Sequence, residues 1–315
     1  MVGVAYLFPG QGSQAVGMGK ALYEHSALAR EVFQQADDAL GFKISTLCFE
    51  GPEAELRRTA ITQPAILTVS VAAWRVLEAE VGAKAVAVCG HSLGEYSALV
   101  ATGCLSLTDA VKSVHARGQF MQEAVPEGEG AMAAVLGMEA ARIQEICAAL
   151  SNPDAKELVE VANYNGPDQT VIAGHKAGVE KAGAELKAKG AKRVMPLPVS
   201  APFHCALMKP VQPRLTEVLK KATFSALKVP CVSNVEAAPN QDGEKARALL
   251  VDQVVKSVRF TECVAALSAL GVDTFVELGP GKVLTGMVKR IQKDSKLLNV
   301  EDVNSLNAAV AALKA

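Results

Sequence analysis

Short apolar runs alternate with longer segments of helical periodicity along the first and last parts of the chain. The apolar runs predict buried strands over residues 4–8, 85–89, 229–233 and 274–278. Helical spacing, together with capping and proline signals, predicts helices over residues 21–40, from Thr62 to 77, and from Ser106 to 124. This alternation is typical of a parallel sheet that has helices on both faces.

The middle of the chain has a different pattern. Strands are predicted over residues 131–138, 157–163, 170–173 and 193–198, with helices over 139–150 and 176–189. The resulting order is β-α-β-β-α-β, which is that of a ferredoxin-like unit. The sequence therefore predicts an α/β protein with a discontinuous, hydrolase-like parallel-sheet large domain, residues 1–127 and 199–315, and an inserted ferredoxin-like α+β small domain, residues 128–198.

Composition narrows the class of protein. The chain has 315 residues, half of them hydrophobic, with 32 basic and 33 acidic side chains. A net charge of −1 and 4% aromatic residues argue against a nucleic-acid partner and against binding to a membrane surface. Residues 1–8 have no basic region and break at Pro9-Gly10, so they predict a first strand and not a signal peptide. The apolar stretch 85–104 is interrupted by His91 and Glu95, and makes a poor membrane span.

The seven cysteines are odd in number and none forms a C-x-x-C pair. Zinc sites and disulfide frameworks are therefore not expected, and no metal is predicted. Free thiols fit a reducing environment, so the predicted localisation is cytoplasmic.

The sequence Gly90-His91-Ser92-Leu93-Gly94 follows one predicted strand and precedes a helix-like segment. In that context G-x-S-x-G is typical of a nucleophile elbow, in which a sharp turn projects the serine hydroxyl away from the sheet. Ser92 would then be the nucleophile, and the N–H of Leu93 one donor to the oxyanion. The alternative is a glycine-bounded loop with an ordinary serine.

Among five histidines, His204 is the best candidate for the base. It lies where the inserted unit rejoins the large domain, in a loop stiffened by Pro198 and Pro202. His91 adjoins Ser92, but neighbours on a sharp turn point in different directions. The alternative is that His204 is a structural or surface histidine.

No acid completes an obvious triad. The aspartates between Ser92 and His204 are one predicted helix cap, Asp109, and two turn residues, Asp154 and Asp168. A backbone carbonyl or an amide side chain could hold the imidazole instead, because that role is to fix the tautomer and the orientation of the ring.

Arg117 falls within the apolar stripe of the predicted helix 106–124, three residues after Val114 and four before Met121. An arginine on an inward face needs acceptors, since burying it unpaired is costly. Arg117 is either a bidentate site for a substrate carboxylate or a rim arginine that pairs with an acid of the protein.

Seven sequence elements, in this order and spacing, resemble the malonyl-CoA:acyl carrier protein transacylase family over residues 7–287. They are Pro9-Gly10-Gln11-Gly12, Gly90-His91-Ser92-Leu93-Gly94-Glu95, Arg117-Gly118-x-x-Met121-Gln122, Asn163-Tyr164-Asn165-x-Pro167-x-Gln169-x-Val171-Ile172-x-Gly174, Phe203-His204-x-x-Leu207-Met208, Gln253-x-x-x-x-Val258-Arg259-Phe260 and Glu277-x-Gly279-Pro280-Gly281. One such element is weak, but seven in order are highly specific. The chain length resembles that of the stand-alone bacterial enzymes of fatty acid synthesis.

The resemblance implies a role for each candidate. Ser92 would be the nucleophile and His204 its base, with a main-chain carbonyl near Gln253 orienting the histidine. The backbone N–H groups of Leu93 and Gln11 would form the oxyanion hole, and Arg117 would bind the malonyl carboxylate.

The implied reaction is a ping-pong transfer through a malonyl-serine. Malonyl-CoA and acyl carrier protein are the implied partners of a monomer. No cofactor is implied, because CoA belongs to the substrate and phosphopantetheine to the carrier protein. Two basic pairs, Lys192-Arg193 and Lys289-Arg290, are candidates for contacts with CoA phosphates or with the acidic carrier, or are ordinary solvated charges.

Two other functions remain open at this point. A serine hydrolase such as a thioesterase would use the same elbow with water as the final acceptor, and would need an acid in the order Ser…Asp…His. A non-catalytic binding or assembly subunit would keep the fold without the chemistry, but both Ser92 and His204 are present.

Overall fold

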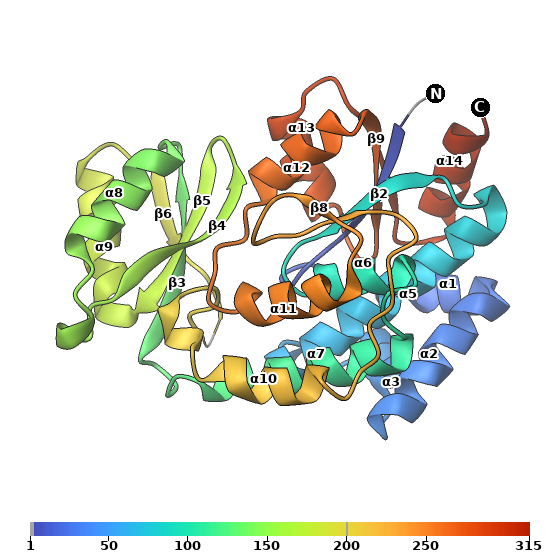
Figure 1. Cartoon of the computed structure of the whole chain (residues 1–315), viewed down its shortest axis with the longest axis horizontal. Helices are drawn as coiled ribbons and strands as arrows, with labels where there is room; N and C mark the ends of the chain where they lie inside the picture. The colour runs from blue at the N-terminus through green and yellow to red at the C-terminus, as the bar shows by residue number, and fades with distance from the viewer. Residues whose placement is uncertain (1–2, 200) are drawn as a thin grey trace.

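The computed structural model describes residues 3–199 and 201–315, which form two sheets lying side by side (Figure 1). The larger sheet has six strands in the order β10-β9-β1-β2-β7-β8, and the smaller has four in the order β4-β5-β3-β6. The strands are β1 (Gly3–Phe8), β2 (Ala85–Gly90), β3 (Gly130–Leu136), β4 (Val159–Gly166), β5 (Gln169–His175), β6 (Arg193–Pro196), β7 (Cys231–Val232), β8 (Pro239–Asn240), β9 (Val272–Leu278) and β10 (Lys296–Val300).

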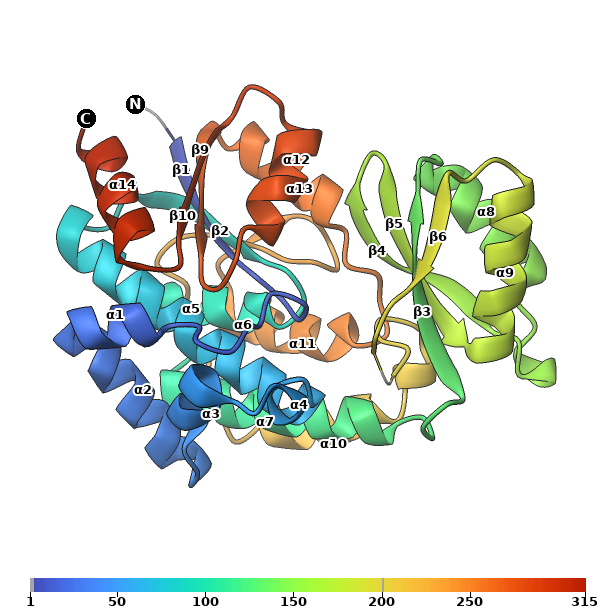
Figure 2. The same cartoon turned by 180° about the vertical axis from the view of Figure 1, so that it is seen from behind.

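Helices cover both faces of the larger sheet, whose strands are parallel except at the β7–β8 edge (Figure 2). Along β1, Tyr6 and Phe8 pack into one core cluster while Ala5 and Leu7 pack into another on the opposite face. The α-helices are α1 (Lys20–His25), α2 (Ala27–Leu40), α3 (Ile44–Glu50), α4 (Glu53–Leu56), α5 (Thr59–Val81), α6 (Gly94–Ala101), α7 (Leu107–Glu123), α8 (Ala140–Leu150), α9 (Lys176–Ala188), α10 (Val211–Leu219), α11 (Gly243–Gln253), α12 (Phe260–Ala269), α13 (Val283–Ile291) and α14 (Val303–Lys314). This mixed α/β architecture with a mostly parallel sheet agrees with the predicted class.

The smaller sheet is antiparallel throughout, and its segment of the chain contains β3, α8, β4, β5, α9 and β6 in that order. The predicted order of elements in this segment is therefore confirmed, with each end shifted by three residues or fewer. Ala133 and Val135 of β3 pack against α8 and α9. Met132 and Ala134 belong to the core of the larger part, which is the portion of the protein built around the six-stranded sheet. One face of this sheet is thus turned toward the larger part of the protein.

Two helix predictions were wrong in detail. The helix expected over residues 21–40 is two helices, because Ser26 has extended backbone angles between α1 and α2. The helix expected from Thr62 begins at Thr59, so Pro64 lies inside α5. Proline lacks the N–H that would bond to the Ala60 carbonyl. His115 of α7 contacts that carbonyl through Nδ1 at 2.7 Å, which satisfies the freed acceptor.

By length and composition alone, α5 is apolar enough to cross a membrane. Of its most apolar 18-residue window, 83% is buried inside the protein. A buried apolar helix is typical of a protein core, and α5 packs against α2 and α7 in the core around the larger sheet.

Candidate active site

The turn between β2 and α6 has the geometry of a nucleophile elbow. Ser92 adopts a left-handed backbone conformation with φ of 53°, which is strained for a residue with a side chain. A Cβ on Gly90 would lie 1.9 Å from the Gly94 carbonyl carbon, so the two ends of the turn approach too closely for larger residues. The glycines of the motif therefore have a steric cause, and the turn places Ser92 at the carboxyl end of a parallel strand.

Ser92 and His204 are brought together although 112 residues separate them. The Ser92 hydroxyl lies 2.7 Å from Nε2 of His204, within hydrogen-bond distance of a general base. His204 is 4% exposed and also has a left-handed backbone, with φ of 61°. Both residues of the pair thus have strained backbones, which is common at functional sites.

The other ring nitrogen of His204 is held by the backbone. Nδ1 donates to the Gln253 main-chain carbonyl at 2.9 Å, the partner implied by the family resemblance. Burial, helped by the positive charge of Arg117, lowers the His204 pKa to about 3, while the bond to Gln253 acts in the opposite direction. The imidazole is therefore neutral at pH 7 and can accept a proton from Ser92.

None of the three aspartates considered for a triad lines the cavity around Ser92. Asp109 lies in the first turn of α7, where its N–H donates to the capping Ser106 hydroxyl and its carboxylate accepts from it. Asp154 lies in a short 3-10 helix, and Asp168 lies in the β4–β5 turn beside Arg290. The His204 ring is thus oriented by a carbonyl, not by a carboxylate.

Arg117 points from α7 into the same cavity and is 1% exposed. Its guanidinium donates to the Ser92 hydroxyl at 3.0 Å, to Gln63 Oε1 at 2.8 Å and to Gln253 Oε1 at 2.9 Å. All three acceptors are neutral, and Arg117 forms no ion pair with an acid in residues 3–199 and 201–315. Burial lowers the Arg117 pKa, while the nearby Tyr96 and Glu95 act in the opposite direction. An arginine keeps its proton, so the cavity contains a positive charge that no contacting acid of the described residues pairs.

Two predicted oxyanion donors flank the serine. Gln11 follows β1 and Leu93 follows Ser92, and both line the cavity. Neither backbone N–H donates a hydrogen bond to another residue that the structure describes. Both donors are therefore available to an oxyanion formed at Ser92.

The cavity has a volume of about 150 Å³ and lies between the two sheets. Its second wall comes from the smaller sheet and the loop that follows β6, and α13 also lines it. The lining residues from these segments are Met132, Asn163, Asn165, Val171, Leu197, Val199, Val283, Leu284 and Met287.

Several residues of the site were not singled out as functional from the sequence. His91 bonds Asn165 of β4 through Nε2 at 2.8 Å, which ties the elbow to the smaller sheet. Gln63 is an acceptor for Arg117, and Glu95 and Asn234 lie buried beneath the elbow. Two features of the sequence could have pointed to these residues: Glu95 is a carboxylate within an otherwise apolar helix, and Asn234 is a polar residue just after β7.

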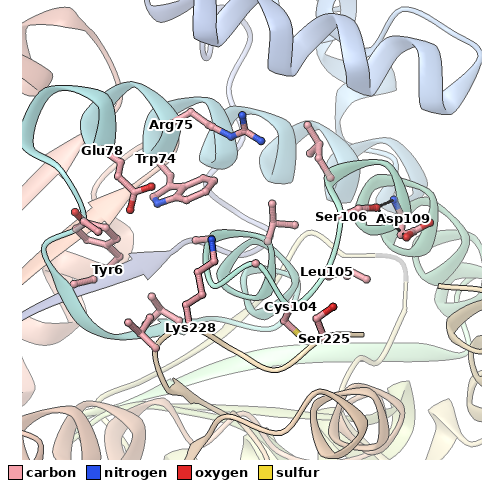
Figure 3. Close-up of a pocket in the computed structure, with 18 of the residues that line it drawn as sticks. Tyr6, Trp74, Arg75, Glu78, Cys104, Leu105, Ser106, Asp109, Ser225 and Lys228 are labelled. Carbon is pink, nitrogen blue, oxygen red and sulfur yellow. Dashed lines mark hydrogen bonds between the residues drawn. The ribbon is translucent and has the colours of Figure 1, made fainter. Parts of the chain in front are cut away.

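Another cavity, of about 570 Å³, lies elsewhere in the larger part, between α5, the start of β2 and residues 223–229 (Figure 3). Trp74, Glu78 and Lys228 line it, but no predicted site residue does. In the described part of the chain, no three His, Cys, Asp or Glu side chains gather in a way that could hold a metal ion.

The two basic pairs lie outside the Ser92 cavity. Lys192 and Arg193 are exposed at the start of β6, whose other end leads to the cavity-lining Leu197. Arg290 of α13 is held by Gln169 at 3.0 Å. The structure therefore does not bring Lys192 and Arg193 to the reacting atoms, and their contact with a substrate or partner stays a prediction.

Known proteins resemble this chain over its whole length. The family model "Acyl transferase domain" matches residues 5–311. Malonyl CoA-acyl carrier protein transacylase of Escherichia coli K12 is 47% identical over 314 residues, covering 100% of both chains. That of Bacillus subtilis is 47% identical over 311 residues, covering 99% of this chain and 97% of the relative.

Solved structures agree with this resemblance. The malonyl CoA-acyl carrier protein transacylase of Coxiella burnetii superposes with a TM-score of 0.96 at 40% identity, covering 100% of this chain and 98% of the other. A malonyl-transacylase solved in complex with a type II polyketide synthase acyl-carrier protein has a TM-score of 0.95 at 43% identity, with 98% and 99% coverage. With Ser92, His204 and Arg117 gathered in one cavity, the chain belongs to the malonyl CoA-acyl carrier protein transacylase family of acyltransferases.

Proposed function

We propose that this acyltransferase moves a malonyl group from malonyl-CoA to the phosphopantetheine thiol of acyl carrier protein, and so supplies fatty acid elongation. The observation that carries the proposal is the Arg117 guanidinium, which lies 3.0 Å from the Ser92 hydroxyl and forms no ion pair with an acid of the described residues. An acyl group that ends in a carboxylate would place its anionic end on Arg117 while its thioester carbon lies near Ser92.

The transfer is a ping-pong reaction with a malonyl-serine intermediate. The Ser92 oxygen attacks the thioester carbonyl while His204 Nε2 accepts the hydroxyl proton. The tetrahedral intermediate collapses by breaking the carbon–sulfur bond, and the proton on His204 passes to the departing CoA thiolate. The phosphopantetheine thiol then loses its proton to His204 and attacks the malonyl-serine, which restores the Ser92 hydroxyl.

The backbone groups of Gln11 and Leu93 donate to the oxyanion in both half-reactions. These donors are fixed before the substrate arrives, so they need no reorganisation when the charge develops. Loss of one such donor costs roughly 10²–10³ in rate.

A thioesterase would carry out the first half-reaction and then admit water. The geometry favours the transferase for two reasons: His204 is oriented by the Gln253 carbonyl and not by an acid, and Arg117 matches an anionic acyl group. The malonyl carboxylate on Arg117 would hold the intermediate until the carrier thiol arrives.

The proposal extends to the whole protein. It acts as a cytoplasmic monomer without a cofactor, a nucleic-acid partner or a membrane, and Lys192-Arg193 help to attract CoA or the carrier. The strand orders support a hydrolase-like large domain, residues 1–127 and 199–315, and a ferredoxin-like insertion, residues 128–198.

The test is incubation with malonyl-CoA, an acid quench, and mass spectrometry of the intact protein and of its peptides. A malonyl adduct on Ser92 is expected, and addition of holo acyl carrier protein should discharge it onto the carrier. Accumulation of CoA and free malonate without an adduct would instead indicate a hydrolase.

A further inference from the structure

A buried carboxylate lies beneath the nucleophile elbow and takes no part in the steps above. Glu95, the second residue of α6, is 2% exposed. One of its oxygens, Oε2, accepts a hydrogen bond from the Asn234 backbone N–H and another from Gln253 Nε2, both at 2.9 Å. A single oxygen therefore joins the elbow helix to two segments that lie about 140 and 160 residues further along the chain.

The first of these segments holds the backbone of the serine. Asn234 Oδ1 accepts from the Ser92 N–H at 2.7 Å, and Asn234 Nδ2 donates to the Gly90 carbonyl at 2.7 Å. Asn234 thus bridges the Gly90 carbonyl and the N–H of the strained residue Ser92. The bond from its backbone to Glu95 fixes where the Asn234 side chain stands.

The second segment contains Gln253, which contacts Arg117 directly. Gln253 Nε2 donates to Glu95 and to the Ser92 carbonyl at 3.1 Å, while Gln253 Oε1 accepts from Arg117. An amide can turn over and exchange its oxygen and nitrogen. The Glu95 oxygen accepts the shortest of three bonds from Gln253 Nε2, which also lies 3.3 Å from Asn234 Oδ1. These acceptors require the NH₂ on their side and leave the oxygen facing Arg117. The opposite orientation would place N–H groups against the guanidinium.

We propose that Glu95 is a positioning residue for substrate selection, which acts through Gln253 on Arg117 and through Asn234 on Ser92. The inference deepens the proposed function and rests on the assignment of Arg117 to the malonyl carboxylate. What the network needs from Glu95 is an acceptor oxygen. Burial raises the Glu95 pKa to about 7, with the bonds from Asn234 and Gln253 and the charge of Arg117 acting against it. Oε2 remains an acceptor in either protonation state, since the proton can reside on the other oxygen.

The experiment compares Glu95→Gln with Glu95→Leu, using malonyl-CoA and acetyl-CoA as competing donors and holo acyl carrier protein as acceptor. Glu95→Gln keeps an acceptor oxygen and should retain the wild-type selectivity within about threefold. Glu95→Leu removes it, and kcat/KM for malonyl-CoA should fall roughly 10–100-fold, because small displacements of a positioning group have effects of that size. Acetyl transfer, which does not use Arg117, should fall less, so the malonyl-to-acetyl ratio drops.

The matched control is Asp37→Asn. Asp37 is a carboxylate on α2, 6% exposed, that accepts from the Ser45 N–H and hydroxyl and takes no part in the site. This variant should lower the unfolding temperature without moving the malonyl-to-acetyl ratio. A malonyl-to-acetyl ratio that falls equally in Glu95→Leu and in Asp37→Asn would mean that loss of stability alone explains the effect, and would overturn the inference.

A second variant covers the case in which Glu95→Leu does not fold. Gln253→Leu keeps the main-chain carbonyl for His204 and the Glu95–Asn234 bond, but removes the acceptor of Arg117, so the same fall in ratio is expected. The double variant Glu95→Leu/Gln253→Leu should have a malonyl-to-acetyl ratio no lower than that of Gln253→Leu alone, because the effect of Glu95 on selectivity passes through Gln253. Wild-type ratios in Gln253→Leu, or in folded Glu95→Leu, would overturn the inference. If Arg117→Ala also keeps the wild-type ratio, it is the proposed function that fails.

Discussion

The two walls of the Ser92 cavity are built differently. The wall from the larger part carries polar side chains that are buried and held by one another, among them Ser92, His204 and Arg117. Among the described residues, the wall from the smaller sheet and the loop after β6 carries no charged side chain: Met132, Val171, Leu197 and Val199 line it beside Asn163 and Asn165. In the proposed mechanism the first wall therefore supplies the reacting groups, and the second gives the cavity its shape.

This difference has energetic consequences. A buried polar group that loses its partner costs about 1–3 kcal/mol, and a buried charge costs more. An apolar wall tolerates swaps of similar volume at a cost below about 1.5 kcal/mol. Substitutions on the polar wall should therefore change the rate of acyl transfer or its selectivity. Substitutions on or near the other wall should change the affinity for the substrate or the carrier only modestly.

The largest effect is expected from Ser92→Ala on the polar wall. Without the hydroxyl no acyl-enzyme forms, and transfer should fall by about 10⁶-fold, as in other enzymes that lose their nucleophile. Mass spectrometry after incubation with malonyl-CoA measures the adduct, and CoA release measures the rate. Ser97→Ala is the matched control: Ser97 is buried one turn further along α6, and should keep the adduct. A malonyl adduct on Ser92→Ala protein would place the nucleophile elsewhere.

Arg117→Ala comes next. A charge-assisted hydrogen bond to the malonyl carboxylate is worth about 1.5–3 kcal/mol, so malonyl transfer should fall roughly 10–150-fold. Acetyl transfer should rise relative to it, because no unpaired guanidinium then opposes the neutral acyl group. Competition between the two CoA esters measures the ratio.

Arg75→Ala serves as the control, since Arg75 is an exposed arginine of α5 outside the Ser92 cavity. An unchanged malonyl-to-acetyl ratio in Arg117→Ala would remove Arg117 from substrate binding and leave the polar wall without its specificity element.

A pH profile distinguishes His204 from an ordinary histidine. Because its pKa is about 3 and not the usual 6.5, the rate of acylation by malonyl-CoA should not fall as the pH drops through 6.5. Single-turnover release of CoA between pH 5 and 8 measures this step alone. In Arg117→Ala the His204 pKa should rise, because the nearby positive charge is gone. A break at pH 6.5 in the wild-type profile would contradict a desolvated base.

The same shift affects stability. Between pH 6.5 and about 3 the folded state binds fewer protons at His204 than the unfolded chain does. The contribution of His204 is therefore complete above pH 6.5 and is lost as the pH falls toward 3. Glu95 acts in the opposite direction: its pKa is raised from 4.5 to about 7, so its contribution is present below pH 4.5 and is lost as the pH rises through 7. Urea unfolding of wild type and His204→Asn at several pH values isolates the histidine.

The elements that form the two walls were predictable from sequence to different extents. The elbow is encoded locally, because Gly90 and Gly94 make the turn and the flanking pattern gives the strand and the helix. The four strands of the smaller sheet and the two helices α8 and α9 were also predicted, since their periodicity is local. The contact of Ser92 with His204 was implied by family resemblance, as no local pattern encodes a distance across 112 residues.

The residues that hold Ser92 and Arg117 in place were not predicted, because their contacts also join remote segments of the chain. Gln63, Glu95 and Asn234 act through bonds that join remote segments, and an amide or a carboxylate has no periodicity of its own. The inward position of Arg117 was visible in the helical stripe, but its acceptors were not. The break at Ser26 was missed because apolar spacing continues through it.

The smallest effect is expected beside the apolar wall, at Lys192 and Arg193. Exposed charges away from the reacting atoms change the rate of encounter more than the strength of the final complex, and each contributes about 0.2–1 kcal/mol. Replacing both with alanine should raise KM for acyl carrier protein about threefold at low salt and leave kcat unchanged. The difference should disappear at high ionic strength, where exposed charges are screened. Lys220→Ala/Lys221→Ala, an exposed pair that follows α10, is the control with the same change in net charge. If both double variants have the same KM at every salt concentration, then the start of β6 does not attract the carrier, and the smaller sheet contributes only shape.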